Sequence, residues 1–197
     1  MIEPLARPDP RHRLGLIVVD VNRAFFDPRG SSYYPGVEEV VEPLGELLAA
    51  ARRAQRLVIY AREAHRAGLY DFELAKLPVH CVLDQLDAEP WPGFEERTGE
   101  LVISKRRYSA FFATDLALVL HEQQVERVLV VGVKTNVCIR ATVQDAFAHG
   151  FRPAVVRQAV SSNRPHLHAA ALEDIERYFG DVLDLDAGLR LLDDSRD

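Results

Sequence analysis

Short apolar runs rich in β-branched residues alternate along this chain with longer helix-like segments. The runs are continuous rather than alternating with polar residues, which is typical of strands buried on both faces of a sheet. Strands are predicted at Leu14–Val19, Leu57–Ala61, Leu101–Ser104, Val128–Val133, Ala154–Val156 and, more weakly, Val182–Leu185. Helices are predicted at Val37–Ala54, with a bend at Pro43, and at Thr114–Gln123, Val137–His149 and His166–Tyr178. The alternation predicts a three-layer α/β/α fold, with helices on both faces of a six-stranded, mostly parallel sheet.

Composition and charge limit the class of protein. The 197 residues, 48% of them hydrophobic, suffice for one domain covering residues 1–197. A formal net charge of −6 leaves no basic surplus for phosphates, so we expect a small-molecule partner and no nucleic acid. The N-terminal residues 1–13 are followed by no apolar run long enough for a signal peptide or a membrane span. We therefore expect a cytoplasmic protein with no membrane partner, in which Cys81 and Cys138 stay reduced.

Three residues with useful chemistry follow predicted strands. Asp20 follows the first strand, Lys105 the third, and Cys138 comes soon after the fourth. Each has an ordinary explanation on its own: a cap, a solvated strand end and a small apolar core residue. In a parallel sheet, however, ligands bind beyond the carboxyl ends of the strands, where these three residues would meet as a base, a charge-balancing group and a nucleophile. No glycine-rich phosphate turn follows Asp20, which disfavours a dinucleotide cofactor. We expect no other cofactor either.

The stretch GVKTNVCIRATVQDAF is the most informative part of the sequence. It predicts a tight strand-to-helix turn with Asn136 as the helix cap and Cys138 in the first turn. The free N–H groups and the positive end of the helix dipole at that position favour a thiolate and could hold an oxyanion. The longest irregular stretch, Pro78–Gly99, is predicted to form a loop over the site.

Together these motifs resemble the isochorismatase-like cysteine hydrolases, which include nicotinamidases and the N-carbamoylsarcosine, ureidoacrylate and biuret amidohydrolases. The resemblance is carried by VVDVNRAFF, SKRRYSAF and GVKTNVCIRATVQDAF, and it runs from about Leu14 to Leu185. It implies a catalytic triad of Asp20, Lys105 and Cys138 that cleaves a small C–N bond through a thioester. It also implies a cis peptide before Lys134, an oxyanion hole formed by the backbone N–H groups of Lys134 and Cys138, and a homo-oligomer, either a dimer or a tetramer.

Four residues are candidates for substrate binding. Phe26 and Tyr108 match positions that often line the pocket in the resembled family, with ordinary core packing as the alternative. Arg62 could pair with a substrate carboxylate, and Lys134, which stands where alanine is common, would suit an anionic or carbonyl-rich substrate. For both cations the alternative is exposure to solvent. The two cations favour N-carbamoyl or ureido compounds, whereas nicotinamide-like amides are disfavoured by an incomplete set of metal ligands.

Metal-binding nicotinamidases supply an acidic residue and two histidines near the second strand. Glu63 and His65 could be two such ligands, but the dozen residues after them hold no further histidine, so we predict no metal. His65 is then expected to pack or hydrogen-bond beneath the site, and Cys81 to be structural. Two alternatives to the amidohydrolase remain open. One is an isochorismate-type vinyl-ether hydrolase, which needs an acid but no thiol, and the other is a catalytically silent binding or assembly member.

Overall fold

The computed structural model describes residues 8–194. Within them, one sheet has the strand order β3–β2–β1–β4–β5–β6, and every pair of neighbouring strands is parallel. The strands are β1 (Leu14–Val19), β2 (Leu57–Glu63), β3 (Leu101–Lys105), β4 (Arg127–Val133), β5 (Arg152–Ser161) and β6 (Asp181–Leu183). The predicted three-layer fold with six strands is confirmed, although β2 and β5 run further than their apolar cores suggested.

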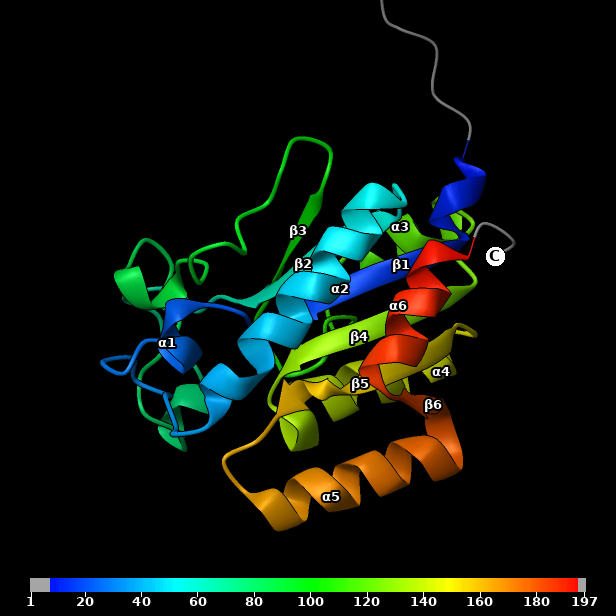
Figure 1. Cartoon of the computed structure of the whole chain (residues 1–197). Helices are drawn as coiled ribbons and strands as arrows, with labels where there is room; N and C mark the ends of the chain where they lie inside the picture. Colours follow the sequence, from blue (N-terminus) through cyan, green and yellow to red (C-terminus); the bar gives the residue numbers. More distant parts are fainter. Residues whose placement is uncertain (1–7, 195–197) are drawn as a thin grey trace, which may run out of the picture.

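Helices cover both faces of the sheet (Figure 1). They are α1 (Arg23–Phe26), α2 (Val41–Arg53), α3 (Leu116–Glu122), α4 (Arg140–Ala148), α5 (Pro165–Asp174) and α6 (Leu185–Asp193). One core cluster joins α2 and α6 to Leu16, Leu129 and other residues of the sheet. The second cluster joins α3, α4 and α5 to the opposite face, through Ile17 and Val130 among others. Successive residues of a strand thus pack into different core clusters, one on each face of the sheet, as expected for strands buried on both faces.

The helices α2 and α6 differ from the sequence prediction. No bend is needed at Pro43, because Val37–Val40 forms a separate 3-10 turn and α2 begins at Val41. Pro43 therefore lies in the first turn of α2, where a backbone N–H has no intrahelical acceptor. The sequence prediction also missed α6, which starts two residues after β6. Its N-cap is Asp184, whose side chain accepts a hydrogen bond from the N–H of Ala187 at 2.7 Å.

The strand order reverses between β1 and β4, and this places a crevice at their carboxyl ends. Gly132, near the end of β4, lies very close to β1. Its φ is +115°, and a Cβ atom there would lie 2.0 Å from the carbonyl oxygen of Val19. Only glycine fits this approach, which brings the turn after β4 beside the residue that follows β1. No helix in the described range 8–194 is both long and apolar enough to cross a membrane.

Candidate active site

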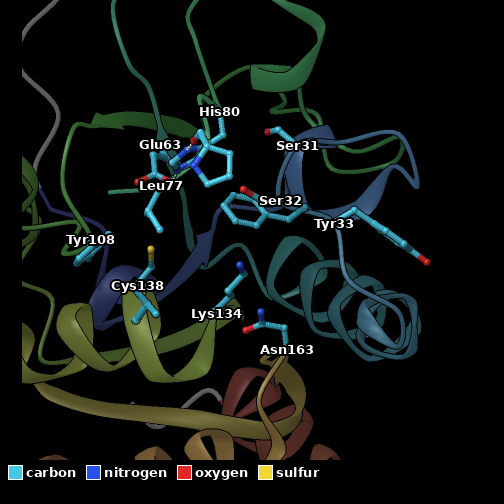
Figure 2. Close-up of a pocket in the computed structure, with 13 residues that line it drawn as sticks. Ser31, Ser32, Tyr33, Glu63, Leu77, His80, Tyr108, Lys134, Cys138 and Asn163 are labelled. Carbon is cyan, nitrogen blue, oxygen red and sulfur yellow. Dashed lines mark hydrogen bonds and ion pairs between the residues drawn. The ribbon is translucent and has the colours of Figure 1, made fainter. Parts of the chain in front are cut away.

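A cavity of about 430 Å³ opens at the carboxyl ends of the central strands. Figure 2 shows the Cys138 sulfur and the Lys134 ammonium pointing into it, with Glu63 and His80 on the facing wall. The residues lining the cavity are Phe25, Ser31, Ser32, Tyr33, Glu63, Leu77, Pro78, His80, Tyr108, Lys134, Val137, Cys138 and Asn163. Of the predicted covering loop, Pro78 and His80 line the cavity, while the later residue Trp91 packs against Phe26.

Asp20, Lys105 and Cys138 lie together beneath this cavity. The Lys105 Nζ lies 2.8 Å from Oδ2 of Asp20 and 3.5 Å from the Cys138 sulfur. One carboxylate oxygen of Asp20, one of Glu63 and the Cys138 sulfur all lie within 4.8 Å of one another. Asp20 and Lys105 are fully buried and Cys138 is 4% exposed, so only the sulfur side of the cluster meets the cavity. The structure thus brings the three predicted residues into contact distance.

Local backbone geometry positions the acid and the lysine. Asp20 has a φ of +54°, a left-handed conformation that aspartate tolerates better than most residues. Its N–H bonds the carbonyl of Ala61, and its Oδ1 accepts the N–H of Glu63 at 2.7 Å. Lys105 is on the edge strand β3, two strands from β1, and it shares the buried face of that strand with Ile103. A side chain as long as lysine is needed to reach Asp20 from there.

Cys138 lies in a π-helical turn, Thr135–Ile139, that precedes α4. The sequence predicted one regular helix capped by Asn136, and this was wrong: the Asn136 side-chain oxygen instead accepts a hydrogen bond from the Ser162 hydroxyl at 2.5 Å. The Thr135 hydroxyl lies 2.9 Å from Nδ1 of His168, which ties the turn to α5. π-helical turns occur often at functional sites. The peptide bond between Val133 and Lys134, at the entrance to this turn, is cis.

The charges in the cluster are set by burial and by one cation. Burial raises the pKa of the Cys138 thiol well above its usual value, although the Lys105 charge opposes this. Burial also raises the pKa of Asp20, again against the effect of Lys105. Burial alone would lower the pKa of Lys105, but the negative charge of Asp20, with a further contribution from Glu63, outweighs burial and raises that pKa. Burial thus opposes the thiolate that the helix start favours, and it favours a neutral thiol beside an acid that can accept its proton.

Two predicted substrate-binding residues lie elsewhere. Arg62 points away from the cavity, where it pairs with Glu96 at 2.7 Å and donates to the carbonyl of Phe94. Successive strand residues face opposite sides of a sheet, and in β2 it is Glu63 that faces the cavity. Phe26 is core and packs on Trp91, whereas its neighbour Phe25 lines the cavity.

The other two substrate-binding candidates, Tyr108 and Lys134, both line the cavity. Tyr108 follows β3 and Lys134 follows β4, so they approach the cavity from different strands. Both belong to motifs that carried the family resemblance, which was therefore the useful signal for these positions.

Beside the cavity lies a group of four buried side chains that could hold a metal ion: Glu63, His65, Glu73 and His80. One nitrogen or carboxylate oxygen from each lies within 4.8 Å of the others. The sequence prediction did not find this complete group. The premise for predicting no metal was wrong, because the second histidine, His80, comes from beyond the dozen residues searched after His65. As expected, His65 is buried beneath the site, where its Nδ1 lies 2.9 Å from Oδ2 of Asp71.

These four residues fit a divalent transition metal. His65 Nε2, Glu63 Oε1 and both carboxyl oxygens of Glu73 are buried and have no hydrogen-bond partner among the described residues. Burial and the nearby Glu63 raise the pKa of Glu73 to about 7, which a bound cation would reverse. Imidazole and carboxylate are ligands that Zn²⁺ accepts, and the Asp71 contact orients His65 as an outer partner should. A bound ion would supply positive charge at the cavity wall.

We expect chelator-treated protein to take up about one Co²⁺ per chain, measured by visible absorption and by metal analysis. A Cys138→Ala background removes the thiol as a competing ligand. His80→Gln should abolish the uptake because it removes one nitrogen ligand, while His166→Gln, on the exposed start of α5, should leave it unchanged. If the Cys138→Ala protein takes up no metal, the four side chains form only a hydrogen-bonded cluster.

Comparison with known proteins places this site in a family. The isochorismatase domain model matches residues 15–187. The chain is 37% identical over 178 residues to a maleamate amidohydrolase of Pseudomonas putida, covering 85% of this chain and 81% of the relative. It is 31% identical over 194 residues to an N-carbamoylsarcosine amidase of an Arthrobacter species, covering 92% and 72% respectively. An isochorismatase-like hydrolase from Alkaliphilus metalliredigens superposes with a TM-score of 0.85 at 26% identity, covering 90% of this chain and 98% of that one. With most of its length matched in these ways, and with an acid, a lysine and a cysteine at the carboxyl ends of its parallel strands, this chain belongs to the isochorismatase family.

Proposed function

We propose that this protein hydrolyses the C–N bond of a small amide, with Cys138 as the nucleophile and a thioester as the intermediate. One observation carries the proposal: the Cys138 sulfur faces a cavity while a buried lysine, 3.5 Å away, pairs with a buried aspartate behind it. A nucleophile with a base and a charge-balancing group in reach is the arrangement that covalent catalysis requires. The names of the two curated relatives, an amidohydrolase and an amidase, support the same reaction class.

In the first half-reaction, Asp20 accepts the thiol proton as the Cys138 sulfur bonds to the amide carbonyl carbon. The carbonyl oxygen becomes an oxyanion, and we assign its stabilisation to the backbone N–H groups of Lys134 and Cys138. The tetrahedral intermediate then collapses and the C–N bond breaks. The leaving nitrogen takes the proton from Asp20 and departs as an amine, or as ammonia from a primary amide.

In the second half-reaction, Asp20 removes a proton from water, and the resulting hydroxide attacks the thioester. The C–S bond breaks, the sulfur recovers a proton, and a carboxylic acid leaves. Lys105 stays protonated throughout and balances the negative charge that passes between Asp20 and the sulfur. A neutral resting thiol suits this sequence, because the proton moves only when the substrate is in place.

The substrate class follows from the size of the cavity and from the relatives. A cavity of about 430 Å³ is in the lower part of the usual range for ligand sites and suits a small molecule. We propose N-carbamoyl and ureido compounds and short-chain amides as the candidates. Vinyl-ether hydrolysis of the isochorismate type is less well supported, since that reaction needs no thiol and leaves the contact between Lys105 and Cys138 without a role.

An ammonia-release screen tests the proposal. The purified protein is incubated with maleamate, N-carbamoyl amino acids, ureidoacrylate, biuret and nicotinamide, and ammonia is measured enzymatically. We expect release from at least one of the first four at a rate above that of the Cys138→Ala protein. Isochorismate is included as a separate arm, read by pyruvate formation. Turnover of isochorismate alone, or of nothing at all, would contradict the amidase proposal.

A further inference from the structure

Lys134 is the one lysine among the described residues that lines the cavity, and its charge has no acidic partner there. Its ammonium points into the cavity (Figure 2), and no carboxylate of the described residues lies within 4.0 Å of it. It lies 5.5 Å from the ring centres of both Phe25 and Tyr34. The two rings hold the ammonium by cation–π attraction and shield it from water. They do not neutralise it.

The protonated form of Lys134 is disfavoured as long as no counter-ion is beside it. Burial lowers the pKa of Lys134, and the negative charge of Glu63 only partly opposes this. The chain's other two lysines are in different situations: Lys105 is paired with Asp20, and Lys76 is exposed. A half-buried ammonium without a counter-ion gains most from an anion that enters the cavity with the substrate.

Without a metal ion, the described side chains of the opposite wall offer no unpaired cation to an anion. The charged groups of that wall are Glu63 and His80, which are hydrogen-bonded to each other at 3.1 Å. The cavity is therefore electrostatically asymmetric, with the free positive charge at the Lys134 end. Asn163, from the loop after β5, lines that cavity too and adds an uncharged amide.

Lys134 and the nucleophile also belong to one short structural element. The backbone of Lys134 leads directly into the π-helical turn that carries Cys138, and the carbonyl of Lys134 accepts the N–H groups of Val137 and Ile139. These hydrogen bonds fix the backbone of Lys134 relative to that of Cys138, so the ammonium and the sulfur enter the cavity from one short element. A ligand that reaches both must be compact, with its anionic group a few bonds from the carbonyl under attack.

We propose that Lys134 binds a carboxylate of the substrate, and that it makes the enzyme selective for compact amides carrying a carboxylate over neutral amides of the same size. This inference rests on the proposed amidase function and specifies its substrate class. Lys134 acts here through its side chain, in addition to the proposed use of its backbone N–H. Because the carboxylate is remote from the bond that breaks, the side chain contributes mainly to binding, and its loss should raise KM more than it lowers kcat.

The test compares two substrates of nearly equal shape, maleamic acid and its neutral diamide, with four proteins. These are the wild type, Lys134→Met, Lys134→Arg and Lys76→Met, the last of which removes the same charge from outside the cavity. We expect the wild type to prefer the acid. Lys134→Met should lower kcat/KM for the acid by about 10- to 100-fold, the usual range for a lost charged hydrogen bond, with most of the change in KM. The kcat/KM for the diamide should fall by much less than that for the acid, so that the preference for the acid shrinks. Lys134→Arg should retain most of the preference, and Lys76→Met should behave as wild type.

A binding measurement keeps the inference separate from the proposed function. Maleate dianion is titrated by calorimetry into the Cys138→Ala protein with Lys134 intact and with Lys134→Met added, and circular dichroism confirms that each variant is folded. Loss of maleate binding on removing Lys134 supports the inference even if no amide is turned over. Equal binding with and without the lysine, or equal loss of activity on the acid and the diamide, would overturn it. If Lys134→Met does not fold, Lys134→Gln takes its place, and the wild-type preference for the acid remains a test.

Discussion

Replacing Cys138 with alanine should reduce amide hydrolysis by about 10⁴-fold or more, because it removes the atom that forms the covalent intermediate. The expected loss is chemical rather than structural. Alanine occupies less volume at a site that is 4% exposed but borders the cavity, so the fold should persist. Steady-state kinetics together with a thermal unfolding curve separate the two effects. Serine at position 138 should also be nearly inactive, since its hydroxyl is a much weaker nucleophile beside the same base.

Cys81 provides the matched control. It is fully buried, lies 3.6 Å from the Asn22 side-chain nitrogen, and does not line the cavity. Burial raises the pKa of its thiol further from the physiological range. Cys81→Ala should therefore retain most of the activity, with some loss of stability from the cavity left in the core. Loss of activity in the Cys81 variant and its retention in the Cys138 variant would show that the wrong thiol has been assigned.

Asp20→Asn should lower the rate by about 10²–10⁴-fold, the usual contribution of a general base. Asparagine has nearly the same size and tolerates the left-handed conformation that Asp20 adopts, so the substitution tests the charge rather than the shape. The Lys105 ammonium would lose its buried partner at 2.8 Å. Breaking such a pair costs about 3–5 kcal/mol of stability, so rates are to be measured well below the unfolding temperature of each variant.

Lys105→Met completes this experiment. Methionine fills a similar space but leaves the carboxylate of Asp20 unbalanced in a site without water contact, so turnover should fall here too. The double variant, Asp20→Asn with Lys105→Met, should be little worse than the poorer single variant, because the two residues act as one unit. Near-full activity of a folded Asp20→Asn protein would instead point to another base, and Glu63, which lines the cavity and lies within 4.8 Å of Asp20 and Cys138, would be the first to test.

The strand ends and the chemistry at them could be predicted from the sequence. Apolar runs that are buried on both faces stand out against the helices, and parallel strands necessarily bring their carboxyl ends to one edge of the sheet. Asp20, Lys105 and Cys138 could therefore be grouped without knowing the strand order. The family resemblance then added Tyr108 and Lys134, which do line the cavity.

The misassigned residues depended on geometry finer than the sequence pattern. Arg62 and Glu63 are neighbours on one strand, and a shift of one residue exchanges the face that meets the cavity. Phe25 and Phe26 are neighbours on the short helix α1, where successive side chains also point in different directions. Phe25 lines the cavity, whereas Phe26 packs in the core. His80 could not be placed, because it reaches Glu63 from an irregular loop whose path leaves no periodic signal.

The protonation state of the nucleophile also lay beyond the sequence. The position of Cys138 at a helix start favours a thiolate, but the complete burial of its surroundings and the negative charge of Asp20 act in the opposite direction. Which effect dominates depends on how deeply Asp20 and Lys105 are enclosed, and this is a property of the folded chain. A neutral thiol makes the base essential, because the proton must leave the sulfur during the attack.

The central claim, that Cys138 forms a covalent acyl intermediate, is tested most directly by mass spectrometry of the enzyme quenched with acid during turnover. The wild-type enzyme is quenched at saturating substrate, because Asp20→Asn would slow formation of the thioester as well as its hydrolysis. We predict a mass increase equal to the acyl part of the substrate, located on the peptide that contains Cys138 and removed by hydroxylamine. It should be absent from the Cys138→Ala protein. A protein that releases ammonia at the wild-type rate while never carrying an acyl group on Cys138 would contradict the account.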